Sequence, residues 1–397
     1  MVGNRPRLVT IWASYGSMHI ARVNALEELG FEVYAYSYSN LVPSYEFFRE
    51  TPLRHRLIND APSDFVNPVG SLWRTLRQLR HDQPDLILAC GYERPETLAA
   101  LVYANVKRLA GAQRVMVMIM MDNQLDDRLR RPLTEAVKRQ YLRLFDGFSV
   151  GGSSHIAYLE HLRVDTGKIL TGYNCVDNAR ISTSAATFRK SADSPPYTNY
   201  FLTLGRLIPK KNVSLIIDAY AAYRDMLPAA NQPWDLVIAG DGPTRQELQD
   251  QVRRGNLSSS VHMVGRIDQL DEAVRYYSFC KAFVLASNRS EQWGLVVNEA
   301  MAAGVPVLVS RQCGCSTELV RPEVNGFVFD GNSVSDLTDR LLWIHRNEHQ
   351  LQAMGQAAQS IVDEYSPRNF AVKVARYYWD RRANKTMVPE SPRPPDS

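Results

Sequence analysis

The chain of 397 residues is longer than a single hydrophobic core usually supports, so the sequence predicts two domains. Its 45% apolar and 22% charged residues are ordinary for globular proteins and exclude a disordered or fibrous protein. The net charge of +4 comes from residues 1–190 and forms no basic stripe with interleaved aromatic residues, so no nucleic-acid partner is expected.

Residues 1–178 alternate short apolar runs with longer segments of helical periodicity, the pattern of a parallel sheet wrapped by helices. The expected strands are 8–12, 31–36, 86–90, 115–121 and 147–150, and the expected helices are 20–29, 71–81, 95–109 and 133–145. These segments predict a Rossmann-like N-terminal domain of the α/β class.

A polar stretch at 179–199 is rich in Ser and Thr and has the composition of a linker. The alternation resumes over 200–366 and predicts a second doubly wound domain. Its expected strands are 200–204, 234–239, 261–264, 282–286 and 305–309, and its expected helices are 213–227, 244–254, 270–278 and 295–303. A helical pattern follows at 367–384, and a polar, Pro-rich tail at 385–397 is expected to be disordered.

The lengths of the apolar runs and the setting of the cysteines indicate the expected cellular compartment. The run Leu8–Ala13 is too short for a signal-peptide core, and no segment reaches the roughly 20 apolar residues that span a bilayer. The five cysteines are odd in number and mostly embedded in apolar runs, which is typical of reduced thiols. We therefore expect a cytoplasmic protein.

The strongest motif runs from Glu291 to Pro306 and has a carboxylate at each end of its first nine residues. The amides of Gly294, Leu295 and Val296 begin a helix, where unpaired N–H groups and the helix dipole can hold a phosphate. Glu291 and Glu299 are separated by about 12 Å at ~1.5 Å per residue, so one can reach a hexose and the other a ribose. Trp293 lies between them and joins the expected binding residues.

A second motif follows the strand expected at 200–204. Gly205 permits close approach of the backbone to a ligand, and Arg206 and Lys211 offer cations to a leaving diphosphate. Lys211 is favoured over its neighbour Lys210. Since the sequence shows no acidic metal cluster, these cations are expected to do the work of a divalent ion, with no metal or cofactor.

Two weaker signals lie between these motifs. They are the strand-to-helix turn Gly240, Asp241, Gly242 and the loop residues Arg266 and Ile267, whose main chain could read a nucleotide base. Each is also an ordinary turn when taken alone.

The order of these motifs, densely over 200–329, resembles family 4 of the retaining glycosyltransferases, which has the GT-B fold of two Rossmann-like domains facing across a cleft. The resemblance implies transfer of a sugar from a UDP- or GDP-sugar with retained anomeric configuration. It also implies that the helix at 367–384 crosses back to the first domain.

The first half resembles the acceptor domain of that family more loosely. The loop with Gly16 resembles one that approaches the donor phosphates, and His19 contacts substrate or else caps and packs its helix. Residues 122–176 resemble a bacterial branch acting on polysaccharides. Relatives often carry a His where this chain has Asp122, near the transferred sugar. A saccharide, lipid-linked or small-molecule acceptor and a peripheral membrane contact are implied.

Two other functions remain open from the sequence. One is a sugar-nucleotide epimerase or phosphorylase with the same fold. The other is a catalytically silent binding subunit of a polysaccharide-assembly complex. The pairing of Arg206 and Lys211 with the two glutamates favours transfer over both.

Overall fold

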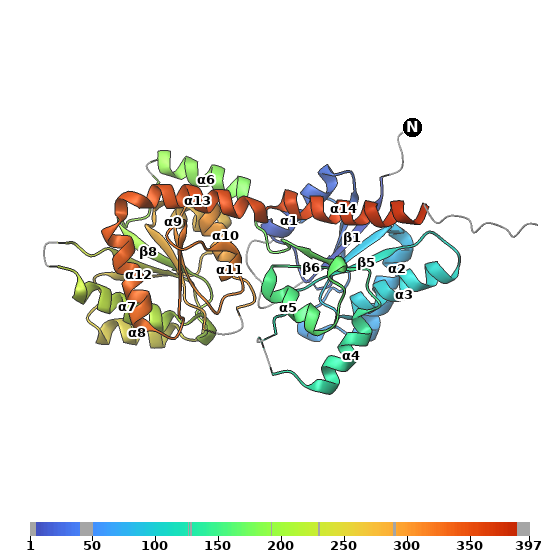
Figure 1. Ribbon diagram of the computed structural model, residues 1–397, viewed down its shortest axis with the longest axis horizontal. Helices are drawn as coiled ribbons and strands as arrows, with labels where there is room; N and C mark the ends of the chain where they lie inside the picture. Colours follow the sequence, from blue (N-terminus) through green and yellow to red (C-terminus); the bar gives the residue numbers. More distant parts are fainter. Residues whose placement is uncertain are drawn as a thin grey trace, which may run out of the picture.

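The structure, a computed structural model, describes residues 5–39, 51–125, 127, 129–191, 193–228, 231–288 and 291–386. These residues form two lobes that lie side by side, each built on a parallel sheet with helices on both faces (Figure 1). The expected α/β class with two Rossmann-like, doubly wound domains is confirmed.

The first lobe contains a seven-stranded sheet in the order β3-β2-β1-β4-β5-β6-β7. Its strands are β1 (Arg7–Trp12), β2 (Glu32–Ser37), β3 (His55–Leu57), β4 (Leu86–Cys90), β5 (Met116–Met120), β6 (Gly147–Val150) and β7 (Ile169–Thr171). Its helices are α1 (Ser17–Glu28), α2 (Pro68–Asp82), α3 (Pro95–Leu109), α4 (Pro132–Leu142) and α5 (Ser153–His161). The strand order reverses between β1 and β4, and a crevice opens at such a switch point in open α/β sheets.

The second lobe contains a six-stranded sheet in the order β10-β9-β8-β11-β12-β13, with its own switch point between β8 and β11. Its strands are β8 (Tyr200–Leu204), β9 (Asp235–Ala239), β10 (Val261–Gly265), β11 (Ala282–Leu285), β12 (Val307–Ser310) and β13 (Gly326–Phe329). Its helices are α7 (Val213–Met226), α8 (Arg245–Arg254), α9 (Leu270–Phe279), α10 (Leu295–Ala302), α11 (Ser316–Leu319), α12 (Val334–Arg346) and α13 (Leu351–Val362).

The last helix, α14 (Pro367–Thr386), leaves the second lobe and runs along the first, where it packs on α1 (Figure 1). Phe370, Val374 and Tyr378 of α14 are buried in the same core as Leu8 and Phe31. The chain therefore crosses between the lobes twice. The tail expected at 385–397 lies outside the described residues from position 387 onward.

The segment expected as a linker forms a helix, α6 (Asn178–Lys190), over most of its length. The side chain of Asp177 accepts a hydrogen bond from the Arg180 amide and caps the helix. Ile181 and Ala185 are buried against α9 and α10 of the second lobe. Phe188 is partly buried against the same core, so three apolar side chains anchor a helix that is otherwise rich in Ser and Thr. This small apolar content explains why the composition resembles that of a linker.

Several other elements differ from expectation. The strand expected at 305–309 begins at Val307, because Pro306 has no N–H to donate to a ladder. The structure also contains β3, α5, β7, β13 and α11 to α13, which the sequence analysis did not assign. Most of these are short or lie in segments without a clear period.

Candidate active site

A cavity of about 450 Å³ lies between the lobes, where the carboxyl ends of both sheets meet. Segments that follow β1, β4, β5, β8 and β9 line it, together with the first turn of α10. The cavity brings together ten of the residues expected from the sequence: Gly16, His19, Asp122, Gly205, Arg206, Gly240, Ile267, Leu295, Val296 and Glu299.

The N-terminus of α10 faces this cavity through Leu295 and Val296. Gly294 precedes it with φ 103°, a left-handed conformation, and a Cβ there would lie 2.8 Å from Leu285 Cδ2. No side chain caps the helix. The first-turn amides are therefore available to an anionic group, because they have no partner within the helix.

Glu299 lies one helical turn further along α10 and lines the same cavity. It is 9% exposed, and the Tyr277 hydroxyl donates to its Oε2 at 3.1 Å. Burial raises the pKa of Glu299 to about 7, against a smaller opposing effect of the Tyr277 hydrogen bond. A carboxyl group with so few donors has spare acceptor capacity for ligand hydroxyls.

Glu291 and Lys211 form a buried ion pair beside the cavity rather than in its wall. Lys211 Nζ lies 2.6 Å from Glu291 Oε2, Lys210 Nζ lies 3.8 Å from the same oxygen, and the Ser287 hydroxyl donates to it at 3.0 Å. Burial would raise the pKa of Glu291, but the two lysines outweigh it, so the pKa is lowered. Lys211 also lines a small hollow with Gly205 and Arg206 that adjoins the cavity.

Arg206 is exposed and lines both the cavity and the hollow. The neighbouring glycines let the turns after β8 and β9 pack closely. A Cβ on Gly240 would lie 1.8 Å from the Gly205 carbonyl oxygen, and one on Gly242 would lie 2.3 Å from the Leu207 carbonyl oxygen. Both have positive φ. These glycines are needed by the fold itself, and Gly240 also opens main chain to the cavity.

His19 lies in the first turn of α1, and its Nδ1 accepts a hydrogen bond from the Gly16 amide at 3.2 Å. Burial, together with the nearby charge of Arg22, lowers the pKa of His19 to about 3. The imidazole is therefore neutral, and its Nε2 carries the proton because Nδ1 is an acceptor. The capping and substrate-contact interpretations of His19 are thus compatible, since one nitrogen caps the helix and the residue lines the cavity.

Asp122 belongs to a hydrogen-bonded chain that joins the lobes. The Asn174 side chain donates to Asp122 Oδ1 at 2.6 Å, while the Asn174 carbonyl accepts from Asn298 Nδ2 at 3.1 Å. Trp293 Nε1 donates to Asn298 Oδ1 at 2.8 Å. Burial raises the pKa of Asp122, partly opposed by His155. This series of hydrogen bonds links helix α10 of the second lobe to the Asp122 carboxylate of the first lobe.

Other expected residues lie outside the cavity wall. Asp241 pairs with Arg245 at 3.4 Å, and Arg266 pairs with Asp268. Trp293 is 3% exposed, and the centroid of its ring lies 6.0 Å from that of the His155 ring. Gly242, Gly294, Glu291 and Lys211 also do not line it. Of these, Trp293 is tied to the cavity-lining helix α10 by its hydrogen bond to Asn298.

Arg22 is a cavity residue to which the sequence analysis assigned no role. It is 1% exposed, its Nη2 donates to the Cys175 carbonyl at 2.8 Å, and its guanidinium lies 4.6 Å from the centre of the Tyr173 ring. Its Nε has no hydrogen-bond partner in the described part of the chain. The signal available in the sequence was its position three residues after His19, on the same face of α1.

No group of three or more His, Cys, Asp or Glu among the described residues is placed to hold a metal ion. None of the described helices has the length and apolar character that crossing a membrane requires.

Residues 184–361 match the sequence model of the family described as glycosyl transferases group 1. A GDP-mannose-dependent alpha-(1-6)-phosphatidylinositol monomannoside mannosyltransferase of Mycobacterium tuberculosis is 28% identical over 188 residues, 46% of this chain and 44% of that protein. The alpha-monoglucosyldiacylglycerol synthase of Streptococcus pneumoniae is 29% identical over 184 residues, 45% of this chain and 38% of that protein. The chain thus spans less than half the length of these relatives.

Solved structures resemble nearly the whole chain. HepE of Anabaena in complex with UDP aligns with a TM-score of 0.69 and 16% identity, covering 94% of this chain and 100% of that one. Sucrose-phosphate synthase of Thermosynechococcus elongatus aligns with a TM-score of 0.67 and 18% identity, covering 96% and 100%. These likenesses show the GT-B arrangement of the two lobes.

Proposed function

We propose that the chain, whose residues 184–361 match the group 1 glycosyl transferases, is a retaining glycosyltransferase that moves a hexose from a nucleotide-diphosphate sugar to an acceptor. The observation that carries the proposal is one cavity in which the first turn of α10 and Glu299 meet Arg206 and the first-lobe His19. A helix N-terminus and an Arg suit a diphosphate, and a buried carboxylate suits sugar hydroxyls.

The donor is proposed to be a UDP- or GDP-sugar. A structure similar to this chain holds UDP, and the mycobacterial relative is named for GDP-mannose. We place the diphosphate on the amides of Leu295 and Val296, the ribose at Glu299, and the base beside Gly240 and Ile267, which line the same cavity.

The chemical step is proposed to occur on one face of the sugar. The bond between C1 and the diphosphate oxygen breaks, the acceptor oxygen bonds to C1, and its proton goes to the departing diphosphate. Arg206, Lys211 and the α10 amides would stabilise the negative charge that develops there. Because these groups are already cationic or dipolar, we propose that no metal is required.

The transferred sugar is proposed to lie at the side of the cavity next to the Glu291–Lys211 pair, which stands just outside the cavity wall, and to face the first lobe. Glu291 keeps its charge through the 2.6 Å contact with Lys211 and can accept from sugar hydroxyls. On the facing side, neutral His19 offers an N–H donor, and Asp122 takes the place of the His that the resemblance implies. Closing the lobes on both substrates would exclude water from the reacting C1.

The acceptor is proposed to be a saccharide or lipid-linked glycan of bacterial glycoconjugate synthesis, met at the cytoplasmic face of a membrane. Both named relatives act on lipids by their printed names. Leu129, Leu133 and Val137 are 98%, 84% and 69% exposed on and just before α4, a helix that projects from the first lobe (Figure 1). Arg131, between Leu129 and Leu133 in the sequence, and Arg143, at the end of α4, are both exposed. Exposed cations near exposed apolar side chains suit an anionic lipid surface.

Sedimentation with anionic vesicles tests the membrane contact. The double change Leu133→Glu and Val137→Glu should abolish binding, while Met226→Glu, at a 56% exposed position of the second lobe, should leave it unchanged. Equal vesicle binding by the double variant and the wild type would contradict the contact.

A thermal-shift panel of UDP, GDP, ADP and TDP, each with EDTA and with magnesium, tests the donor site. A ligand at about one hundred times its dissociation constant should stabilise the protein by about 2.7 kcal/mol. We expect a clear shift for one base that survives EDTA, followed by transfer from the corresponding nucleotide sugar. A shift for none of them contradicts the donor site, and a shift without any transfer or hydrolysis favours a silent binding subunit.

A further inference from the structure

A second cavity, of about 520 Å³, lies at the opposite edge of the first sheet from the cleft. Its walls come from the residues at or just before the starts of β1, β4 and β5 and from the C-terminal halves of α3 and α14. A strand of five or six residues separates the two edges of the sheet by roughly 17–20 Å. The second cavity is therefore distinct from the proposed donor site.

Four cations line this cavity, Arg5, Arg7, Lys107 and Arg382, against one carboxylate, Asp85. Both carboxylate oxygens of Asp85 already accept hydrogen bonds: Arg382 donates to Oδ1 at 3.1 Å, and the Arg7 amide donates to Oδ2 at 2.9 Å.

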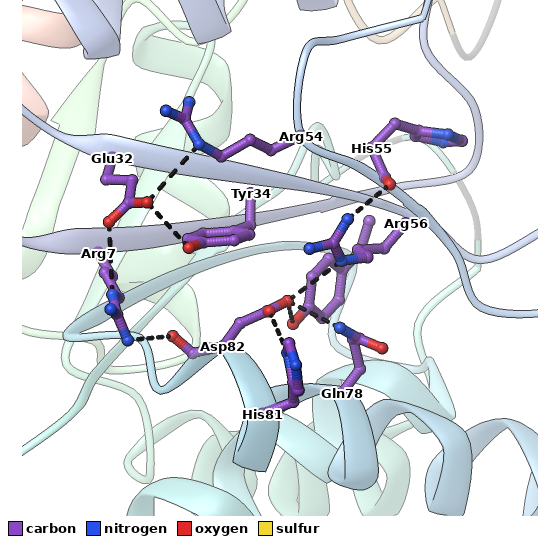
Figure 2. Close-up of polar contacts among 10 residues, drawn as sticks. Arg7, Glu32, Tyr34, Arg54, His55, Arg56, Gln78, His81 and Asp82 are labelled. Atoms are coloured by element: carbon purple, nitrogen blue, oxygen red, sulfur yellow. Dashed lines mark hydrogen bonds and ion pairs between the residues drawn. The ribbon is translucent and has the colours of Figure 1, made fainter.

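The Arg7 side chain is also occupied. Figure 2 shows its guanidinium between Glu32, at 3.4 Å, and the Asp82 carbonyl oxygen, at 3.2 Å. Arg5 and Lys107 remain without a carboxylate partner in the described part of the chain. The wall thus carries an excess of two positive charges that no described side chain neutralises.

Tyr103 gives an independent indication of a ligand. Its side chain lines the cavity and is only 4% exposed, yet its hydroxyl has no hydrogen-bond partner among the described residues. Burial, helped by the charge of Asp85, raises the pKa of Tyr103 to about 12, so the hydroxyl keeps its proton. A buried donor without an acceptor costs free energy unless a bound group satisfies it.

We infer that this second cavity binds a phosphate-bearing anion, with Arg5 and Lys107 as its charge partners and the Tyr103 hydroxyl as a donor. Two spare cations match the charge of a phosphate group near neutral pH. Trp379, 48% exposed in the C-terminal half of α14, adds an apolar surface to the wall. The phosphate belongs either to a soluble metabolite or to a lipid headgroup, which present the same chemistry to these side chains.

The test is calorimetric titration of the whole chain with inorganic pyrophosphate, in excess UDP so that a UDP-binding cleft is filled. Lys107→Glu should weaken pyrophosphate binding by about tenfold or more, as expected for loss of a charge-assisted contact. Arg108→Glu is the matched control, because Arg108 is the exposed neighbour on α3 and does not line the cavity. Tyr103→Phe removes only the unpartnered hydroxyl, so it should fold normally and also weaken binding.

A parallel arm measures sedimentation with vesicles of phosphatidylglycerol or phosphatidylcholine. Pyrophosphate binding that depends on Lys107, without any effect of Lys107→Glu on vesicles, assigns a soluble ligand. Phosphatidylglycerol binding that depends on Lys107 but not on Arg108 assigns a lipid headgroup. The inference is overturned if wild type binds neither probe, or if Lys107→Glu and Arg108→Glu behave alike in both arms.

Discussion

Replacing Glu299 by Gln should remove the pH dependence of donor binding. In the empty protein, burial raises the pKa of Glu299 to about 7 from an ordinary value of 4.5. A ribose needs the carboxylate, which accepts from two hydroxyls, so binding below pH 7 must first release a proton. The affinity of the wild type should therefore fall about tenfold from pH 8 to pH 6, about 1.4 kcal/mol.

The same raised pKa affects folding stability in the opposite direction: donor affinity rises with pH, whereas the stability of the fold falls. A buried acid with a raised pKa is tolerated while protonated, and its burial destabilises the fold progressively as pH rises from the unfolded pKa of about 4.3 to the folded value. The amide side chain in the Glu299→Gln variant cannot ionise. The variant should therefore unfold at a higher temperature than wild type at pH 8, with the difference shrinking toward pH 4, while it binds donor more weakly.

The assay is calorimetric titration at pH 6, 7 and 8 with a nucleotide sugar rather than a nucleoside diphosphate. The terminal phosphate of a nucleoside diphosphate titrates near pH 6 and would mask the effect, whereas the diesterified diphosphate of a nucleotide sugar does not. Asp122→Asn is the comparison variant, because Asp122 is the other cavity carboxyl with a raised pKa and is proposed to face the transferred sugar. A pH slope lost in this variant and kept in Glu299→Gln would assign the proton to Asp122. If Glu299→Gln keeps the wild-type pH slope, the placement of the ribose at Glu299 is refuted.

Three further predictions concern the pair beside the cavity, the contact between lobes and the first-lobe core. Lys211→Met should lower kcat/KM by about tenfold or more. Lys210→Met should lower it less, because Lys210 Nζ lies 3.8 Å from Glu291 Oε2 and Lys211 Nζ lies 2.6 Å from it. Equal losses in steady-state kinetics would contradict the assignment. Asn298→Ala leaves the Asn174 carbonyl and an indole N–H without partners, so chemical denaturation should show a loss of about 1–3 kcal/mol; an unchanged midpoint would show that this link is dispensable. The lowered pKa of Asp82, whose burial is outweighed by the donors around it (Figure 2), means that its carboxylate stabilises the fold above the unfolded pKa of about 3.9 and less at more acid pH. Asp82→Asn should therefore destabilise at pH 7 and have little effect near pH 2, and a loss independent of pH would argue against the charge.

The alternation of apolar runs and helical periods in the sequence was sufficient to predict the α/β class, two doubly wound domains and most of their central strands. Central strands of parallel sheets are buried on both faces, so they appear as uninterrupted apolar runs such as 116–120. Edge strands and short helices carry too few apolar residues for the same signal. β3 and β7 have three residues each, and none of these six residues is fully buried.

The spacing of motifs along the sequence also predicted most of the candidate site residues of the second lobe. Gly205, Arg206, Leu295 and Glu299 follow strands or begin helices at a single sheet edge, so local sequence determines that they meet. The Asp241 and Arg266 side chains form local ion pairs instead, because each has an opposite charge within four residues.

The residues that face this edge across the cleft could not be identified without the folded structure. Arg22 and Asn174 lie more than 150 residues apart, and the hydrogen bond from Asn298 to the Asn174 carbonyl joins different lobes, so no local pattern encodes their meeting. The pKa of Glu299 depends on burial by surrounding elements. The cation excess around Lys107 depends on the carboxylate that β2 places beside Arg7 and on the arginine that α14 places beside Asp85. Periodicity and motif spacing are local properties of the chain, whereas desolvation and charge balance are sums over neighbours that folding alone brings together.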